Sequence, residues 1–213
     1  MIKMKIDLPL DQMPNVDRKR VLKYLQQIGL VETVINYIID WRTRRQVTLK
    51  RWISSKECDL PIDVISKTEY IKELPNNDLK AKAILKFVKE NISYKKDQEI
   101  WGVVEKWQTP EETWNLKTGD CEDGAILGYK IAEEVGIPDF QIYITAGLVM
   151  GGGHCYLVYV SDRNGLEYPI DWCYWYVDSY KMYTNYAERS TYINGEQEWF
   201  RFNSSGHFKL WKK

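Results

Sequence analysis

The sequence lacks a net charge, a long apolar run and a secretory leader. Its 30 basic and 30 acidic residues cancel, so no overall field directs the chain toward nucleic acid or an anionic membrane. The most apolar long stretch, residues 140–160, is interrupted by glycines, Gln141 and His154, so we expect no membrane span. Residues 1–14 mix charged with apolar residues and do not resemble a signal peptide. These features predict a cytoplasmic or virion-associated protein.

The sequence also lacks the cysteine spacing of a zinc site and has few histidines. None of its 4 cysteines forms a C-x-x-C pair, and without a secretory signal we expect them to be reduced. The 2 histidines are His154 and His207, and His207 lies close to the C-terminus. Any histidine-dependent chemistry therefore falls mainly on His154.

The length and composition fit a globular chain. The 213 residues are 44% hydrophobic and 28% charged, which suits one domain with an added arm. Apolar residues recur at helical spacing from residue 15 to 51, so we predict an N-terminal helical arm over residues 1–74. Residues 75–213 would form the main domain, ending in aromatic-rich strands. A basic stretch near residues 42–51 is typical of a solvated helix face.

Helices are predicted before strands along the second region. One helix is expected from Leu79 to Asn91, and Thr109 with Pro110 has the form of another helix start. A further helix should begin after Asp120 and end before Gly136, a left-handed terminator. Strands are expected over residues 141–146, 154–160, 166–172, 198–202 and 207–211, with a hairpin turn at residues 194–195. This order indicates an α+β fold with helices packed on an antiparallel sheet.

Cys121 is placed where a thiol becomes reactive. Asp120 would cap its helix and Asp123 would reach back to the cap, so the thiol lies in the first turn. Unpaired N–H groups and the helix dipole favour a thiolate there, and the Cys121 N–H could face an oxyanion. The alternative is a buried, inert thiol. The polar neighbours of Cys121 argue against that alternative, although adjacent acids would raise the thiol pKa.

His154 and Asp171 are the expected partners of the thiol. Three glycines precede His154 and leave space beside the ring. Asp171 interrupts an apolar strand, and a buried carboxylate needs a partner such as a histidine N–H. A minimal turn at Asn164 and Gly165 would place Asp171 opposite Val158. We therefore predict a longer loop between these strands, with Gly165 in a bulge.

These motifs resemble the transglutaminase-like superfamily, most closely the bacterial transglutaminase-like cysteine proteinases. The resemblance covers roughly residues 77–172. It rests on the segments TPEET (109–113), GDCEDGA (119–125), KAKAILKFVKENISY (80–94), GIP (136–138) and PID (169–171), and on His154. It implies a papain-like core and a cysteine peptidase or amidase that forms an acyl-thioenzyme with the triad Cys121, His154 and Asp171. Cys155 departs from the family pattern, where a small residue is usual, and raises the alternative of a disulfide with Cys121.

The resemblance also implies a calcium site and an oxyanion site. Some bacterial relatives bind calcium with the acids that flank the cysteine, here Asp120 and Glu122, and no other cofactor is expected. Trp101 and Trp107 are candidates for the tryptophan that helps to hold an oxyanion in animal transglutaminases. The expected partner is a protein or peptide substrate.

Several alternatives remain open at this point. The chain could be a true protein-glutamine transglutaminase, an amidase acting on an Asn-linked glycan, or a catalytically silent binding or scaffold module, for instance in a virion. The aromatic residues after Asp171 could form a sugar-stacking groove, although strand packing is the commoner use of such residues; they include Trp172, Trp175, Tyr176, Tyr180 and Tyr183.

Overall fold

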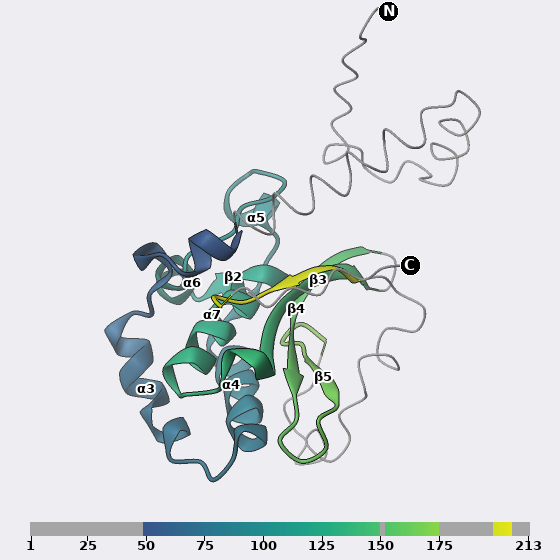
Figure 1. Ribbon diagram of the computed structural model, residues 1–213. Helices are drawn as coiled ribbons and strands as arrows, with labels where there is room; N and C mark the ends of the chain where they lie inside the picture. Colours follow the sequence, from purple (N-terminus) through teal and green to yellow (C-terminus); the bar gives the residue numbers. More distant parts are fainter. Residues whose placement is uncertain (1–48, 150–151, 175–197, 206–213) are drawn as a thin grey trace, which may run out of the picture. The chain divides into compact units, whose positions relative to one another are not determined.

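The computed structural model describes residues 49–149, 152–174 and 198–205 (Figure 1). The chain divides into two compact units, Met1–Arg44 and Arg45–Lys213, and all described residues belong to the second. The arm predicted over residues 1–74 is therefore described only from residue 49 onward. The turn at residues 194–195 and the strand at 207–211 also lie outside the described residues.

Helices form most of the first half of the described chain. Residues 49–53 are helical, followed by η1 (Lys56–Cys58), α3 (Ile62–Lys72), α4 (Asn77–Asn91), α5 (Asp97–Ile100), α6 (Pro110–Leu116) and α7 (Cys121–Glu134). The helix predicted over 79–91 is confirmed as α4. Its cap is Asn76, whose side chain accepts a hydrogen bond from the Leu79 N–H. Helix α4 buries Ala81, Ile84 and Val88 at the helical spacing that the sequence shows.

Part of the region assigned to the arm contributes to the core of the described domain. Ile53, Cys58, Val64 and Ile71 are completely buried in the cluster that also contains the residues of α4 and α7. The boundary after residue 74 stays a prediction. The packing nevertheless shows that the domain's core draws on residues from Ile53 onward.

The predicted Thr109 cap and the predicted contact of Asp123 with the start of its helix are both present. The Thr109 hydroxyl accepts from the Glu112 N–H while the Glu112 carboxylate accepts from the Thr109 N–H, which starts α6 with a capping box. Asp123 reaches back in the same way to the Asp120 N–H, 3.0 Å away, so α7 begins at Cys121. Helix α7 ends before Gly136, whose φ of 80° is the left-handed conformation that glycine favours.

Helix α7 lies at the centre of the domain, between other helices and an antiparallel sheet (Figure 1). The sheet has the order β5-β4-β3-β6 and follows η2 (Asp139–Gln141). Its strands are β3 (Ile142–Val149), β4 (Gly152–Val160), β5 (Glu167–Ile170) and β6 (Glu198–Phe202). A second, parallel pair joins β1 (Ser93–Tyr94) to β2 (Thr118–Gly119), directly before the cysteine. The predicted α+β fold, with helices on an antiparallel sheet, is confirmed.

The loop between β4 and β5 is longer than a minimal hairpin, as predicted. Leu157 pairs with Ile170 and Val160 with Glu167, so residues 161–166 form the connection. Gly165 has a φ of 68° and its N–H donates to the Ser161 carbonyl oxygen, which closes the loop. This register, continued one residue beyond β5, places Asp171 opposite Tyr156. His154, two residues earlier on β4, is then its diagonal neighbour.

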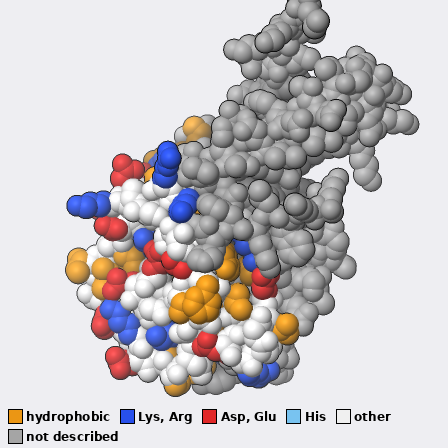
Figure 2. Space-filling view, viewed as in Figure 1, with side chains coloured by type: hydrophobic (Ala, Val, Ile, Leu, Met, Phe, Trp, Pro, Cys, Tyr) orange, Lys and Arg blue, Asp and Glu red, His pale blue; other side chains and the backbone are white. Residues whose placement is uncertain are grey.

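The visible surface agrees with the balanced composition. Acidic, basic and apolar side chains are interspersed on the face shown in Figure 2. Within the described ranges, no helix combines the length and apolar character needed to cross a membrane.

Candidate active site

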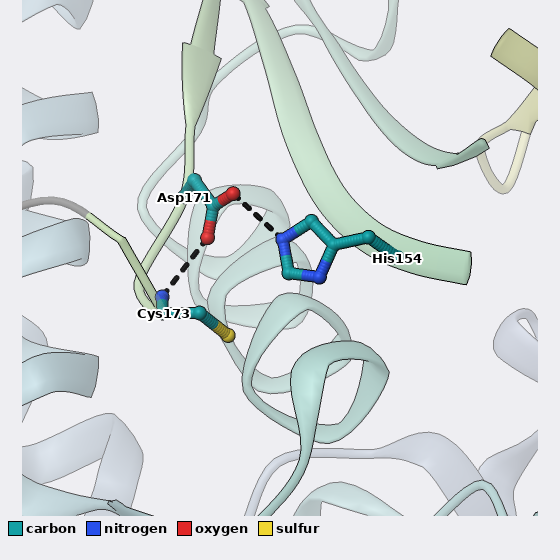
Figure 3. A group of neighbouring side chains, drawn as sticks. All are labelled: His154, Asp171 and Cys173. Carbon is teal, nitrogen blue, oxygen red and sulfur yellow. Dashed lines mark hydrogen bonds and ion pairs between the residues drawn. The ribbon is translucent and has the colours of Figure 1, made fainter. Parts of the chain in front are cut away.

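His154 and Asp171 form a buried pair at one end of the sheet (Figure 3). The His154 Nε2 atom lies 2.7 Å from Asp171 Oδ2, and both side chains are almost completely removed from solvent. The second oxygen of Asp171 accepts from the Cys173 N–H at 2.9 Å. The carboxylate is thus held on both sides, which fixes the orientation of the imidazole ring.

Cys121 is linked to this pair through Trp172, the residue after Asp171. The Trp172 indole Nε1–H donates to the Cys121 carbonyl oxygen at 3.1 Å. Trp172 is itself buried, and the ring of Tyr94 lies 5.9 Å from it. The turn that follows β5 therefore packs directly on the first turn of α7.

The Cys121 thiol points to an acid. Its Sγ donates to Glu122 Oε2 at 3.1 Å, and among the described residues this carboxylate, rather than His154, is its hydrogen-bond partner. Burial raises the pKa of the Cys121 thiol well above its ordinary value, and the charge of Glu122 raises it further. The first turn of α7 alone therefore does not produce a thiolate.

Four carboxylates gather around the start of α7. Burial and the neighbouring acids raise the pKa of Glu122 to about 10 and that of Asp123 to about 8, and they also raise the pKa of Asp120 and Asp97. Ligand atoms of Asp97, Asp120 and Asp123 lie within 4.8 Å of one another, as do those of Asp120, Cys121 and Glu122. Such crowding of acids is unfavourable unless protons or a cation neutralise them.

Several oxygens of this group have no hydrogen-bond partner. Asp97 Oδ1, Asp120 Oδ1 and Glu122 Oε1 are buried and unpaired within the described part of the chain. A buried, unpaired carboxylate oxygen is costly, and hard cations such as calcium prefer oxygen ligands of this kind. The acids at the start of α7 therefore fit a calcium ion.

Comparison with known families identifies the family of this chain. A sequence model described as bacterial transglutaminase-like cysteine proteinase BTLCP matches residues 53–205. The chain belongs to this family. A search of curated proteins gave no match.

Solved structures of Legionella pneumophila LapG are similar to this chain. The calcium-bound form is 18% identical, with a TM-score of 0.47, and the similarity covers 81% of this chain and 85% of that one. The EGTA-treated form is 19% identical, with a TM-score of 0.49, and 84% and 86% of the two chains are covered.

The structure of this family member places the other predicted residues as follows. The Trp107 indole N–H donates to Glu105 Oε1 at 2.8 Å, and the Lys106 ammonium lies 3.3 Å from the centre of the Trp101 ring. Cys155 is buried in the core cluster, on the face of β4 opposite to His154. Trp172 is 5% exposed and is used for packing, whereas Trp175, Tyr176, Tyr180 and Tyr183 lie outside the described residues.

Two residues at the site of this proteinase could not be identified from the sequence. Asp97 starts the short helix α5, 24 positions before the cysteine, and joins Asp120 only through the fold. Cys173 lies beside His154 and Asp171 because residues 172–174 form a turn. The one available signal was the spacing Asp171-x-Cys173, which is too short and too common to be informative.

Proposed function

We propose that this family member is a cysteine peptidase in which Cys121 is the nucleophile, His154 its base and Asp171 the residue that orients the base. The observation that supports this most is the buried His154–Asp171 pair, joined through Trp172 to the first turn of α7. A histidine, a carboxylate and a helix-terminal cysteine are the groups that thiol acyl transfer requires.

The pairing assigns a role to each nitrogen of His154. Asp171 accepts a hydrogen bond from Nε2–H, which leaves Nδ1 to take the Cys121 proton. The thiolate then attacks the substrate carbonyl carbon, and the Nδ1 proton passes to the leaving amine. Water, losing a proton to Nδ1, hydrolyses the acyl-thioenzyme and returns the thiol. The Cys121 N–H, at the first position of α7, has no intrahelical acceptor and is the oxyanion donor that we propose.

The acids beside Cys121 oppose this chemistry until they are neutralised. We propose that Asp120 and Glu122 hold a calcium ion with their unpaired oxygens, and that Asp97, whose ligand atom lies near that of Asp120, moves in as a further ligand to the pair expected from the sequence. A bound calcium ion supplies positive charge near the thiol. Glu122, once engaged by a cation, is a weaker acceptor for the Cys121 proton, and His154 can then take it.

The substrate that we propose is a protein or peptide, with water as the acyl acceptor. Membership of the proteinase family supports hydrolysis of a peptide bond. Transfer to an amine would need a second binding site for the acceptor.

The test is the pH dependence of iodoacetamide labelling at each cysteine, read by mass spectrometry, with and without calcium. In the presence of calcium, we expect Cys121 to be labelled well below the pH at which an ordinary thiol reacts. The His154→Ala variant should lose this reactivity at low pH. Cys58, Cys155 and Cys173 are internal references in the same sample. If Cys121 reacts no faster than these, or is indifferent to His154, the peptidase proposal is wrong and the scaffold alternative gains support.

A further inference from the structure

A second group of metal-binding atoms surrounds the histidine itself. One ligand atom each from His154, Asp171 and Cys173 lie within 4.8 Å of one another, and Figure 3 shows the three side chains converging. This group shares no residue with the carboxylates at the start of α7. An imidazole nitrogen, a thiolate and a carboxylate oxygen are the ligands that zinc binds, whereas calcium disfavours the first two.

The turn after β5 creates this geometry. The Asp171 carboxylate accepts a hydrogen bond from the Cys173 N–H. This contact folds the chain back, so that the Cys173 side chain lies beside Asp171. Asp171 and His154 are fully or almost fully buried, and Cys173 is half-buried, so a metal could enter from the side of the thiol.

The distances are close to those of a zinc site. With bonds of about 2.0–2.3 Å, the ligands of a tetrahedral zinc lie roughly 3.3–3.7 Å apart. The distance of 2.7 Å between His154 Nε2 and Asp171 Oδ2 must widen slightly to reach this range. The Cys173 sulfur lies at most 4.8 Å from the other two ligand atoms, so it must move inward by about 1 Å at most.

The charges around the thiol also favour a divalent cation. After burial, the group with the largest effect on the Cys173 thiol is Asp171, followed by Lys89, Asp120 and Glu122. The Lys89 ammonium donates to the Trp172 carbonyl oxygen at 2.8 Å, and burial lowers its pKa. The Asp171 carboxylate, which has the largest electrostatic effect on the thiol, therefore favours a cation beside it.

We infer that His154, Asp171 and Cys173 form a zinc-binding site, and that zinc held there inhibits the enzyme reversibly by keeping a proton on His154 Nδ1, which then cannot accept the Cys121 proton. The inhibitory consequence rests on the proposed function, whereas the binding site does not. Zinc binding at Nε2 releases the Cys173 thiol proton and shifts the single proton of neutral His154 from Nε2 to Nδ1. A chelator that removes zinc lets the thiol take up a proton again and lets Nε2–H re-form. Zinc would thus compete directly with the hydrogen bond that orients His154.

The test uses cobalt(II) as a spectroscopic substitute for zinc in the full, chelator-treated chain. A thiolate ligand gives a near-ultraviolet charge-transfer band, which we expect in the wild type and which zinc should displace. Cys173→Ser should remove the band and weaken zinc binding by at least about 100-fold. Cys121→Ser should keep the band. Cys155→Ala should keep it too, because Cys155 follows His154 in the sequence but lies on the opposite face of the strand.

The outcomes separate the site from the enzyme mechanism. Absence of the band in the wild type, or its loss in Cys121→Ser and survival in Cys173→Ser, would overturn the inference. Because the band needs no catalysis, it can be present even where Cys121 labelling shows no activation by His154. In that case the zinc site stands and the peptidase proposal fails.

Discussion

The indole ring of Trp172 occupies the space that a side chain at position 124 would need. A Cβ atom built on Gly124 would lie 2.2 Å from Trp172 Cε2 and 2.3 Å from its Nε1, far inside van der Waals contact. The glycine in the first turn of α7 thus permits the indole to reach the Cys121 carbonyl oxygen. Since Trp172 follows Asp171, we expect this contact to affect how closely the His154–Asp171 pair approaches the cysteine.

We predict that Gly124→Ala displaces Trp172. Overpacking of this kind lowers the free energy of unfolding by about 1–3 kcal/mol. A shift of Asp171 by about 1 Å would lower kcat on the order of 100-fold. Denaturant unfolding and peptide hydrolysis measure the two effects.

Gly128→Ala is the matched control on the same helix. Its Cβ would meet the Leu157 Cδ1 atom at 3.2 Å, and this methyl group ends a flexible side chain. The better helix propensity of alanine, about 1 kcal/mol, offsets that contact, so stability and activity should change little. Equal losses in the two variants would argue against the role of Trp172.

Asp171→Asn should impair chemistry more than substrate binding. Asparagine retains an acceptor for the Cys173 N–H but no longer stabilises the imidazolium or fixes the tautomer of His154. We expect kcat to fall on the order of 1,000-fold or more, with KM little changed. Steady-state kinetics test this, and Asp59→Asn, at an exposed position, makes the same chemical change as a control. A change confined to KM would contradict the orienting role.

Calcium should stabilise the protein through Asp97. At a calcium concentration of 100 times Kd, linkage predicts about 2.7 kcal/mol of added stability. Asp97→Asn should weaken calcium affinity at least about tenfold. Titration calorimetry and thermal unfolding with calcium or EGTA measure both effects. Glu99→Gln, two residues away and exposed, should bind calcium as the wild type does, and identical affinities in the two variants would exclude Asp97 as a ligand.

The Glu112 carboxylate should stabilise the folded domain, and this stabilisation should be lost in acid. Burial would raise the pKa of this carboxyl, but the Lys106 ammonium at 2.7 Å and the Thr109 N–H outweigh burial, so its pKa is lowered. A lowered folded-state pKa means that the stabilisation is present above the unfolded value, near 4.3, and is lost as the pH falls through the folded value.

Glu112→Gln should therefore reduce stability at neutral pH and not at low pH. The contact is partly exposed, so the expected loss is below about 1 kcal/mol. Urea unfolding of both proteins between pH 3 and pH 7 measures the difference. Parallel curves, separated by the same amount at every pH, would contradict the role of the charge.

Local interactions made much of the fold predictable. The caps at Thr109 and Asp123, the terminator at Gly136 and the helical spacing of α4 act over a few residues, so the sequence carries them directly. The long loop before β5 was also predictable, because the required pairing of Asp171 with His154 excluded a minimal turn. Helix α3 and the burial of Ile53 were not predicted, because short amphipathic segments gain their stability from packing that a local pattern does not reveal.

The sequence by itself determined the reactive residue types and their order: a cysteine at a capped helix start, a histidine after glycines and an aspartate in an apolar strand. Only the tertiary structure decided which groups meet. It paired His154 with Asp171 diagonally, turned the Cys121 thiol toward Glu122, brought Asp97 to Asp120 and folded Cys173 back to the histidine. Hydrogen bonds and carboxylate repulsion act through space over a few ångströms, and for residues distant in sequence those separations exist only once the chain has folded.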